Sequence, residues 1–160
     1  MVKYLTLFFF ILLIGCEINS EQLIKSENIN FENIKFNAVS KDLKFTNNQE
    51  GPEVETTKKL VKDWFNNNVK IDGFDGNLSI NVTSIEVNKI IKDEYYRFEI
   101  NINIEFLEIN ELLNKRKIYK INSIEYGDIN GSFSIKDTEN LNKNIISNSL
   151  RSINQKVSGM

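Results

Sequence analysis

The clearest pattern in the chain is a strict alternation of apolar and polar residues over residues 96–106. The apolar row is Tyr96, Phe98, Ile100, Ile102, Ile104 and Phe106. The polar row between them is Arg97, Glu99, Asn101, Asn103 and Glu105. Period-two alternation is typical of a strand with one face on a core and the other in water. The sequence therefore predicts an antiparallel sheet with one buried face and one wet face, and the wet face is the broadest surface on which a partner could dock.

Segments on both sides of this strand alternate as well. Residues 78–87 alternate from Leu78 onward, and the phase slips at Ser84, which predicts a β-bulge. Residues 117–135 carry several alternating groups with shifts of phase between them. Their apolar residues are Tyr119, Ile121, Ile124, Tyr126, Ile129, Phe133 and Ile135. This segment is therefore either one long bulged strand or two strands joined by a turn.

Two helices are expected from apolar stripes at spacings of three and four. Pro52 suits the first position of a helix, and the carboxylates of Glu53 and Glu55 favour its positive end. Asp137 or Thr138 is expected to cap the second helix. The first stripe is Val54, Leu60, Val61, Trp64 and Phe65, and the second is Leu141, Ile145, Ile146, Leu150, Ile153 and Val157. Trp64 is accordingly expected in the core.

The order of these elements predicts the fold class. A first strand, with a bulge or a late start, is expected around Ile34, Phe36 and Ala38. The fold is then α+β, an antiparallel four- to five-stranded meander with two helices packed on one face, in the order β-α-β-β-β-α. Residues 29–160 are predicted to form a single domain, since a chain of 160 residues is too short to expect two.

Composition removes several classes of function. The net charge of −2 offers no field for a nucleic-acid backbone, so no nucleic-acid partner is expected. The chain has no histidine, which removes the commonest general base and the commonest metal ligand together. It has one cysteine, which excludes a disulfide within the chain. We expect no cofactor and no enzymatic activity.

Candidate catalytic and metal-binding residues were sought among the carboxylates. Asp72 and Asp75 lie in a Gly-containing turn, but the run lacks the further ligands of a known calcium loop, so no metal site is predicted. No phosphate-binding or nucleophile motif occurs, and no catalytic residue is predicted. The remaining carboxylates are expected on the solvated face of the sheet, and they are Glu99, Glu105, Glu108 and Glu125.

The N-terminus has the layout of a secretory signal. Lys3 precedes an apolar run over residues 5–14, and a small residue, Gly15, stands before the only cysteine, Cys16. The run is too short to span a bilayer, which takes about 20 residues. Residues 1–15 are therefore predicted to be a signal peptide that is removed.

The run Leu13-Ile14-Gly15-Cys16 resembles the lipobox of bacterial lipoproteins. The resemblance implies cleavage of the Gly15–Cys16 bond and attachment of a diacylglycerol to the thiol of Cys16, with acyl chains such as palmitate. Residues 16–28 would then be the lipidated N-terminus and a tether, and the chain would bind the membrane through its lipid anchor. The alternative is a buried cysteine inside an uncleaved anchor helix.

The same resemblance bears on location and function. In lipoproteins of two-membrane envelopes, aspartate after the cysteine signals retention in the inner membrane. Glu17 therefore favours the outer membrane, facing the periplasm. The element order is also similar to that of small α+β envelope lipoproteins, such as the lipopolysaccharide-assembly lipoprotein and auxiliary lipoproteins of lipid-transport ABC systems. The stretch CEINSEQ after the signal departs from the Gly-Tyr or Gly-Phe that usually follows the cysteine of the assembly lipoprotein.

Three functions follow in order of preference. The first is a non-enzymatic accessory or scaffold of an envelope assembly or transport complex, with an envelope protein as partner. The second is a small module that holds a lipid or peptide between its sheet and helices, which would need a cavity there. The third is a lipid-anchored hydrolase. A pull-down in mild detergent distinguishes the first two, because a module would bring down lipid without a stable protein partner.

Overall fold

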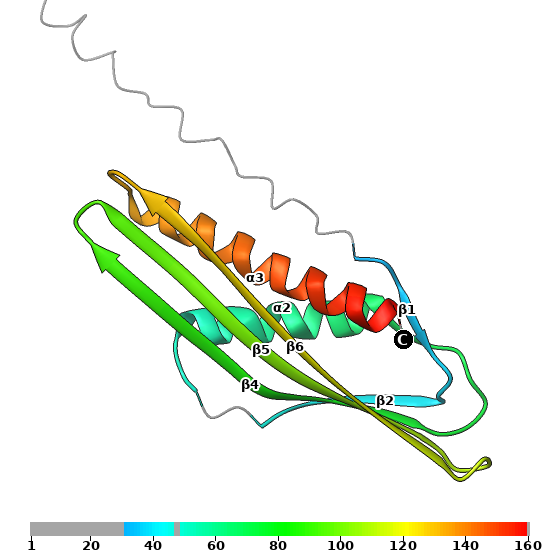
Figure 1. The fold of residues 1–160 in the computed structure, drawn as a ribbon. Helices are drawn as coiled ribbons and strands as arrows, with labels where there is room; N and C mark the ends of the chain where they lie inside the picture. Colours follow the sequence, from blue (N-terminus) through cyan, green and yellow to red (C-terminus); the bar gives the residue numbers. More distant parts are fainter. Residues whose placement is uncertain (1–30, 47–48, 160) are drawn as a thin grey trace, which may run out of the picture.

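The computed structural model describes residues 31–46 and 49–159, which form a four-stranded sheet, a small two-stranded sheet and two helices. The elements in chain order are β1 (Ile34–Phe36), β2 (Ser40–Phe45), α2 (Pro52–Asn68), β3 (Val69–Ile71), β4 (Asn77–Lys92), β5 (Tyr95–Asn110), β6 (Lys115–Asn130) and α3 (Ile135–Ser158). Both helices lie on the same face of the larger sheet (Figure 1). The predicted signal peptide and tether lie outside the described residues.

The larger sheet has the strand order β2-β4-β5-β6. β4, β5 and β6 are antiparallel neighbours joined by short turns, which is the predicted meander. The register of β4 with β5 shifts between Val82 and Ser84, so the predicted bulge is confirmed. β2 pairs in parallel with the first part of β4 at the edge of the sheet. The predicted α+β class is confirmed, with a mixed rather than purely antiparallel sheet.

Two strands, β2 and β3, have no counterpart among the elements expected from the sequence. The expected first strand is limited to three residues in β1, which pairs in parallel with β3, immediately after α2. Phe36 of β1 stacks on Phe106 of β5, with ring centroids 6.1 Å apart. The small sheet therefore lies against the core beside the β5–β6 hairpin.

β6 settles the choice left open for residues 117–135. It is one strand whose register with β5 runs without a shift from Lys115 to Asn130. The phase shift that suggested a bulge arises because Ile124 and Tyr126 point to the face away from the helices, where both are more than half exposed. Ile135 belongs to α3 and not to a strand.

The helix starts agree with the sequence in one case and differ in the other. α2 begins at Pro52, as predicted, with Glu53 and Glu55 in its first turn. The N-cap of α3 is Ser134, so the prediction of Asp137 or Thr138 was wrong. Asp137 is instead the third helical residue, and its carboxylate accepts the backbone N–H of Ser134 at 2.8 Å in a capping box. The hydrogen bonds from the side chain and the backbone of Ser134 lower the pKa of Asp137.

The core fills the layer between the helices and the sheet. All six apolar residues of the alternating row in β5 are buried, and so is Trp64, as predicted. The Trp64 ring packs edge-on against Phe106, and its Nε1–H donates to the side chain of Asn154 at 2.7 Å. A Cβ at Gly127 would lie 2.8 Å from Ile145, so the missing side chain lets α3 approach β6 closely. The described residues thus contain a complete core of two helices on a sheet.

A lysine on the core side of β2 caps the C-terminus of α2. Lys41 is in register with the fully buried Leu78, and its ammonium donates to the Phe65 carbonyl at 2.9 Å and to that of Val69. These carbonyls carry the negative end of the helix dipole, which favours a cation. Burial lowers the pKa of Lys41, and the charge of Lys70 lowers it further.

Candidate docking surface

The face of the larger sheet that points away from the helices is called the outer face here. Strand alternation places the polar row of β5 on it, between residues of β4 and β6 that the register puts beside them. These side chains are partly exposed, because neighbours on both strands shield their stems. The predicted location of the row away from the helices is confirmed, and it forms the middle of a broad polar surface.

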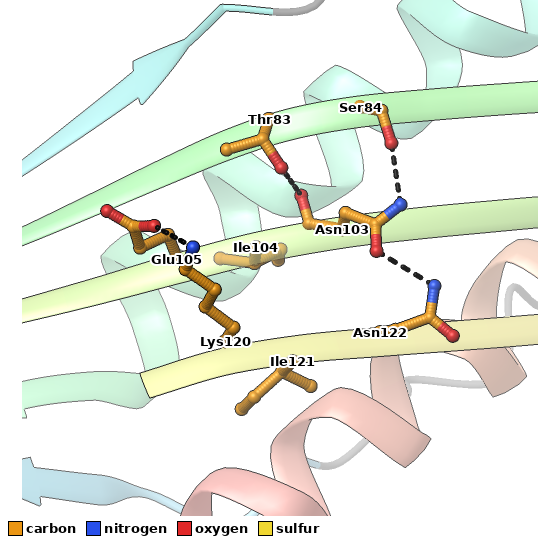
Figure 2. A pocket seen from close by; sticks show the side chains of 8 residues that line it. All are labelled: Thr83, Ser84, Asn103, Ile104, Glu105, Lys120, Ile121 and Asn122. Carbon is orange, nitrogen blue, oxygen red and sulfur yellow. Dashed lines mark hydrogen bonds and ion pairs between the residues drawn. The ribbon is translucent and has the colours of Figure 1, made fainter. Parts of the chain in front are cut away.

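The centre of the outer face is a hydrogen-bonded network across three strands (Figure 2). The Asn103 amide donates to the hydroxyl of Ser84 in β4 at 2.7 Å, and its carbonyl accepts from the Asn122 amide in β6 at 2.9 Å. Asn101, the next residue on the same face, donates to the Glu86 carboxylate at 3.1 Å. These bonds fix the amides in position, so the surface presents an ordered set of donors and acceptors.

A shallow pocket of about 370 Å³ lies over this network. Its lining residues are Thr83, Ser84, Asn103, Ile104, Glu105, Lys120, Ile121 and Asn122. Figure 2 shows the ammonium of Lys120 turned to the carboxylate of Glu105, with an ion-pair distance of 3.5 Å. The lining combines one charge of each sign with amides, hydroxyls and two isoleucines, a mixture typical of a surface that contacts another protein.

A second group on the outer face surrounds Arg97. Its guanidinium lies 3.5 Å from Glu99 and 3.7 Å from Asp128, and 4.2 Å from the centre of the Tyr126 ring. The side-chain hydrogen bond with Tyr95, followed by the charge of Asp128, raises the pKa of Arg97. The guanidinium is thus permanently charged and held by stacking and two carboxylates, which makes it a fixed recognition element.

Two of the four carboxylates expected on the solvated face are on the other side of the sheet. Glu99 and Glu105 lie on the outer face, as predicted, each with a cationic partner. Glu108 is in register with the buried Leu78, and Glu125 with the buried Ile100, so both point to the helix side. The prediction for these two carboxylates was wrong. Glu108 is two residues after Phe106 and Glu125 is four residues after Ile121, and an even spacing along a strand puts each glutamate on the same side as that buried residue. Glu108 is 3.9 Å from Lys117 at the end of the sheet.

The aspartates considered for calcium have structural partners in the described part of the chain. Asp75 accepts the backbone N–H of Leu112 at 2.7 Å, and Asp72 lies 3.8 Å from Lys35. No cluster of three or more metal-ligating side chains occurs within residues 31–46 and 49–159. Each of these carboxylates therefore contacts a different neighbouring segment of the described chain.

The predicted lipidation site lies outside the described residues. Neither Cys16 nor Gly15 can be placed relative to the sheet, so both remain predictions. Within the described part, neither helix is long and apolar enough to cross a membrane. Ile118, Ile124 and Tyr126 also lie on the outer face, which was not predicted, and their exposure makes this face partly apolar along β6.

Comparison with known proteins finds likeness of fold only. Neither a protein-family model nor a curated protein matches the sequence. Among solved structures, the chain is similar to a minor lipoprotein from Acinetobacter baumannii, with 12% identity over 74% of this chain and 90% of that one and a TM-score of 0.46. It is also similar to rare lipoprotein B from Shewanella oneidensis, with 11% identity over 75% of this chain and 94% of that one and a TM-score of 0.45. A third similar structure is lipoprotein B from Nitrosomonas europaea, with 10% identity over 81% of this chain and 84% of that one and a TM-score of 0.39. These structural neighbours are bacterial lipoproteins, and at such identities no residue role carries over.

Proposed function

We propose that this chain is a lipid-anchored bacterial envelope lipoprotein that acts without enzymatic chemistry, as an accessory on which an envelope protein docks. The observation that carries the docking role is the uneven covering of the sheet. Both helices cover one face, while the outer face holds an ordered polar network across three strands. Ordered side chains lose little conformational entropy when a partner binds, so such a surface is prepared for docking.

The anchoring role rests on the sequence before the described residues. Cys16 would carry the diacylglycerol after cleavage of the Gly15–Cys16 bond. Each buried CH₂ of an acyl chain contributes about 0.8 kcal/mol, so two or three chains hold durably. With Glu17 next to the lipidated residue, the protein would stand on the outer membrane and face the periplasm.

Cys16→Ala tests the anchor directly. We expect the variant to lose incorporation of a fatty-acid probe in cells and to be removed from membranes by a carbonate wash that leaves wild type in place, while the domain keeps its melting temperature. The reason is that the described helices cannot replace a lipid anchor. Ser20→Ala, a change of similar size four residues later, is the control and should keep the label. Label on the Cys16→Ala chain would contradict the lipobox interpretation.

A paired set of substitutions tests the docking surface. Asn103→Lys with Asn122→Lys places two charges in the centre of the outer face, whereas Asn66→Lys with Asn67→Lys places the same charges on exposed positions of α2. We expect a pull-down in mild detergent to recover a stable protein partner with wild type and with the α2 pair, but not with the outer-face pair. Equal recovery by all three chains would contradict docking on this face.

The alternative module for a lipid or peptide would need space between the sheet and the helices. That layer is filled by large side chains, among which Trp64, Phe98 and Phe106 are fully buried. A second pocket of about 370 Å³ lies at the surface between α2 and α3, lined by Pro52, Glu53, Thr56, Glu139, Asn142, Lys143 and Ile146. Three of these seven side chains are charged, which does not suit an acyl chain. Recovery of lipid with no stable protein partner would replace the docking proposal by this module.

A further inference from the structure

Three large apolar side chains stand in water at one end of the molecule, and they are called the apolar tip here. Phe74 is fully exposed, at 101%, and Leu112 and Leu113 are exposed at 83% and 61%. Phe74 belongs to the turn between β3 and β4, and the two leucines belong to the β5–β6 hairpin. Exposed apolar residues are common singly, but a group of this size at a loop end marks a contact surface.

The two loops of the apolar tip are fastened to each other. The backbone N–H of Leu112 donates to the Asp75 carboxylate at 2.7 Å. Gly76 has a φ of 87°, and a Cβ there would lie 2.0 Å from the Ile109 carbonyl oxygen. Only glycine allows this close approach of the two backbones. Figure 1 shows both turns at the same end of the sheet.

The hairpin turn itself is also built to present its leucines. The backbone N–H of Leu113 donates to the side-chain carbonyl of Asn110 at 2.8 Å, and the N–H of Asn114 donates to the Glu111 carbonyl at 3.1 Å. Asn114 takes the left-handed conformation that closes the turn, with φ 46°. Three consecutive backbone N–H groups of the turn, those of Leu112, Leu113 and Asn114, thus have acceptors, while the side chains of both leucines are exposed. An apolar medium could take up the leucines without leaving these groups unpaired.

A short basic segment follows the apolar tip directly. Lys115, Arg116 and Lys117 are the first three residues of β6, and all are exposed. The acidic groups nearby are Glu108, 3.9 Å from Lys117, and Asp75 and Glu111 in the two loops, with Asp75 bonded to the N–H of Leu112. Leucine and phenylalanine at the end of a loop, with lysine and arginine just behind them, match the layers of a bilayer surface. The apolar side chains match the acyl-chain layer, and the basic side chains match the anionic head groups at the surface.

The proposed anchor leads to the same half of the molecule. The chain enters the described part at Phe31, whose carbonyl accepts from Asn68 at the end of α2. β1 then runs beside β3, which leads into the turn with Phe74. Residues 17–30 lie between Cys16 and this entry point, and fourteen residues (30 − 16) span at most about 50 Å. A lipid on Cys16 would keep the apolar tip within reach of the bilayer.

We propose that the apolar tip inserts into the surface of a bilayer that contains anionic phospholipids, with its basic segment at the phosphates. The domain then has two membrane contacts, the lipid on Cys16 and the apolar tip, and a fixed orientation. This inference deepens the proposed anchoring, but it concerns different residues. Its test therefore uses a chain of residues 17–160, which contains the complete core and no cysteine.

The experiment is flotation with vesicles of phosphatidylglycerol and phosphatidylcholine in equal parts. Wild type should float with them, and Phe74→Ser, Leu112→Ser and Leu113→Ser combined should weaken binding at least tenfold. Ile90→Ser with Ile91→Ser is the matched control, since these isoleucines are also exposed but lie at the far end of β4. The control should float like wild type. Lys115→Gln, Arg116→Gln and Lys117→Gln combined should weaken binding severalfold.

A reporter at the apolar tip separates insertion from attraction to the surface. The fluorescence of the tryptophan introduced by Phe74→Trp should be quenched by brominated acyl chains. The fluorescence of the tryptophan introduced by Ile91→Trp should not be quenched. Failure of wild type to float, or equal floating of the tip variant at an unchanged melting temperature, overturns the proposal. So does a tip variant that floats normally but no longer recovers a protein partner. Fatty-acid labelling of Cys16 is measured separately, so either proposal can fail alone.

Discussion

The two faces of β5 are built on different principles, although they share one backbone. The helix-side face is a row of large apolar side chains that are fully or almost fully buried under α2 and α3. The outer face is a row of amides and charged groups that bond to their neighbours on β4 and β6. Packing makes the first face intolerant of change, whereas the second is free to vary with the partner it meets. The contrast separates the part of the sheet that makes the fold from the part available for function.

The largest effect should come from placing the same charge on each face in turn. Ile102→Asp puts a carboxylate without a partner into the core, at a cost of about 3–5 kcal/mol, and should abolish the cooperative melt. Asn103→Asp, one residue later, places it beside the Ser84 hydroxyl, which can donate to it. The second variant should melt close to wild type in calorimetry. A similar loss of melting temperature in both variants would mean that the two faces of β5 do not differ in burial.

A smaller loss of stability is expected when the charge of Lys41, on the helix side of the sheet, is removed. Lys41→Met keeps the aliphatic stem but removes the hydrogen bonds to the Phe65 and Val69 carbonyls, which should cost about 1–3 kcal/mol. The control is Lys44→Met on the outer side of the same strand, where the ammonium lies in water, 3.3 Å from the exposed Asp42. We expect that change to cost less than about 1 kcal/mol. Urea unfolding measures both, and equal costs would show that Lys41 does not stabilise α2.

The outer face should tolerate reversal of its charges. Glu99→Lys with Glu105→Lys turns two exposed ion pairs into repulsions, which changes stability by about 1 kcal/mol or less. Glu99→Gln with Glu105→Gln removes the attraction alone and gives the baseline. Thermal melts compare both with wild type. Destabilisation as large as that of Ile102→Asp would mean that this face is also covered, and the docking surface would not exist.

The smallest effect concerns the cap that starts α3. The pKa of Asp137 is lower in the folded chain than its ordinary value of 3.8, because Ser134 donates hydrogen bonds to the ionised carboxylate. A lowered pKa contributes stability above 3.8, and this contribution is lost as the pH falls through the folded value. The melting temperature of Asp137→Asn should therefore lie below wild type at pH 7, and the gap should close as the pH falls below 3.8. Glu139→Gln removes a charge from the same helix as a control, and a gap that does not close with acid would contradict the cap.

Much of the fold follows from periods in the sequence. The alternation in β5, the bulge at Ser84 and the apolar stripes of both helices depend on residues that neighbouring packing demands. Such residues carry the signal by themselves, because a core excludes polar side chains. The same rule explains why Trp64 could be placed in the core from the sequence.

The missing parts depend on contacts that no period encodes. β2 was not expected because Lys41 occupies a core-side position, and only the C-terminus of α2 explains it. Ile124 and Tyr126 look like core residues, yet they cover the polar outer face, where Tyr126 stacks with Arg97. The capping box uses aspartate rather than the more usual glutamate at its third position, so Ser134 was passed over.

The parallel pairing of β2 has a consequence for the order in which the chain is completed. Ser40 pairs with Asn77, 37 residues further on, whereas β4, β5 and β6 pair with neighbours across short turns. β2 therefore stays unpaired until the later residues of β4 are in place, after the export that the proposed signal peptide implies. During this interval Leu43 and Phe45 have no strand beside them, in a segment that also carries Lys41, Asp42 and Lys44. Charges interspersed in an unpaired strand oppose its pairing with another chain, so Lys41, Asp42 and Lys44 would limit aggregation of the chain before it has folded.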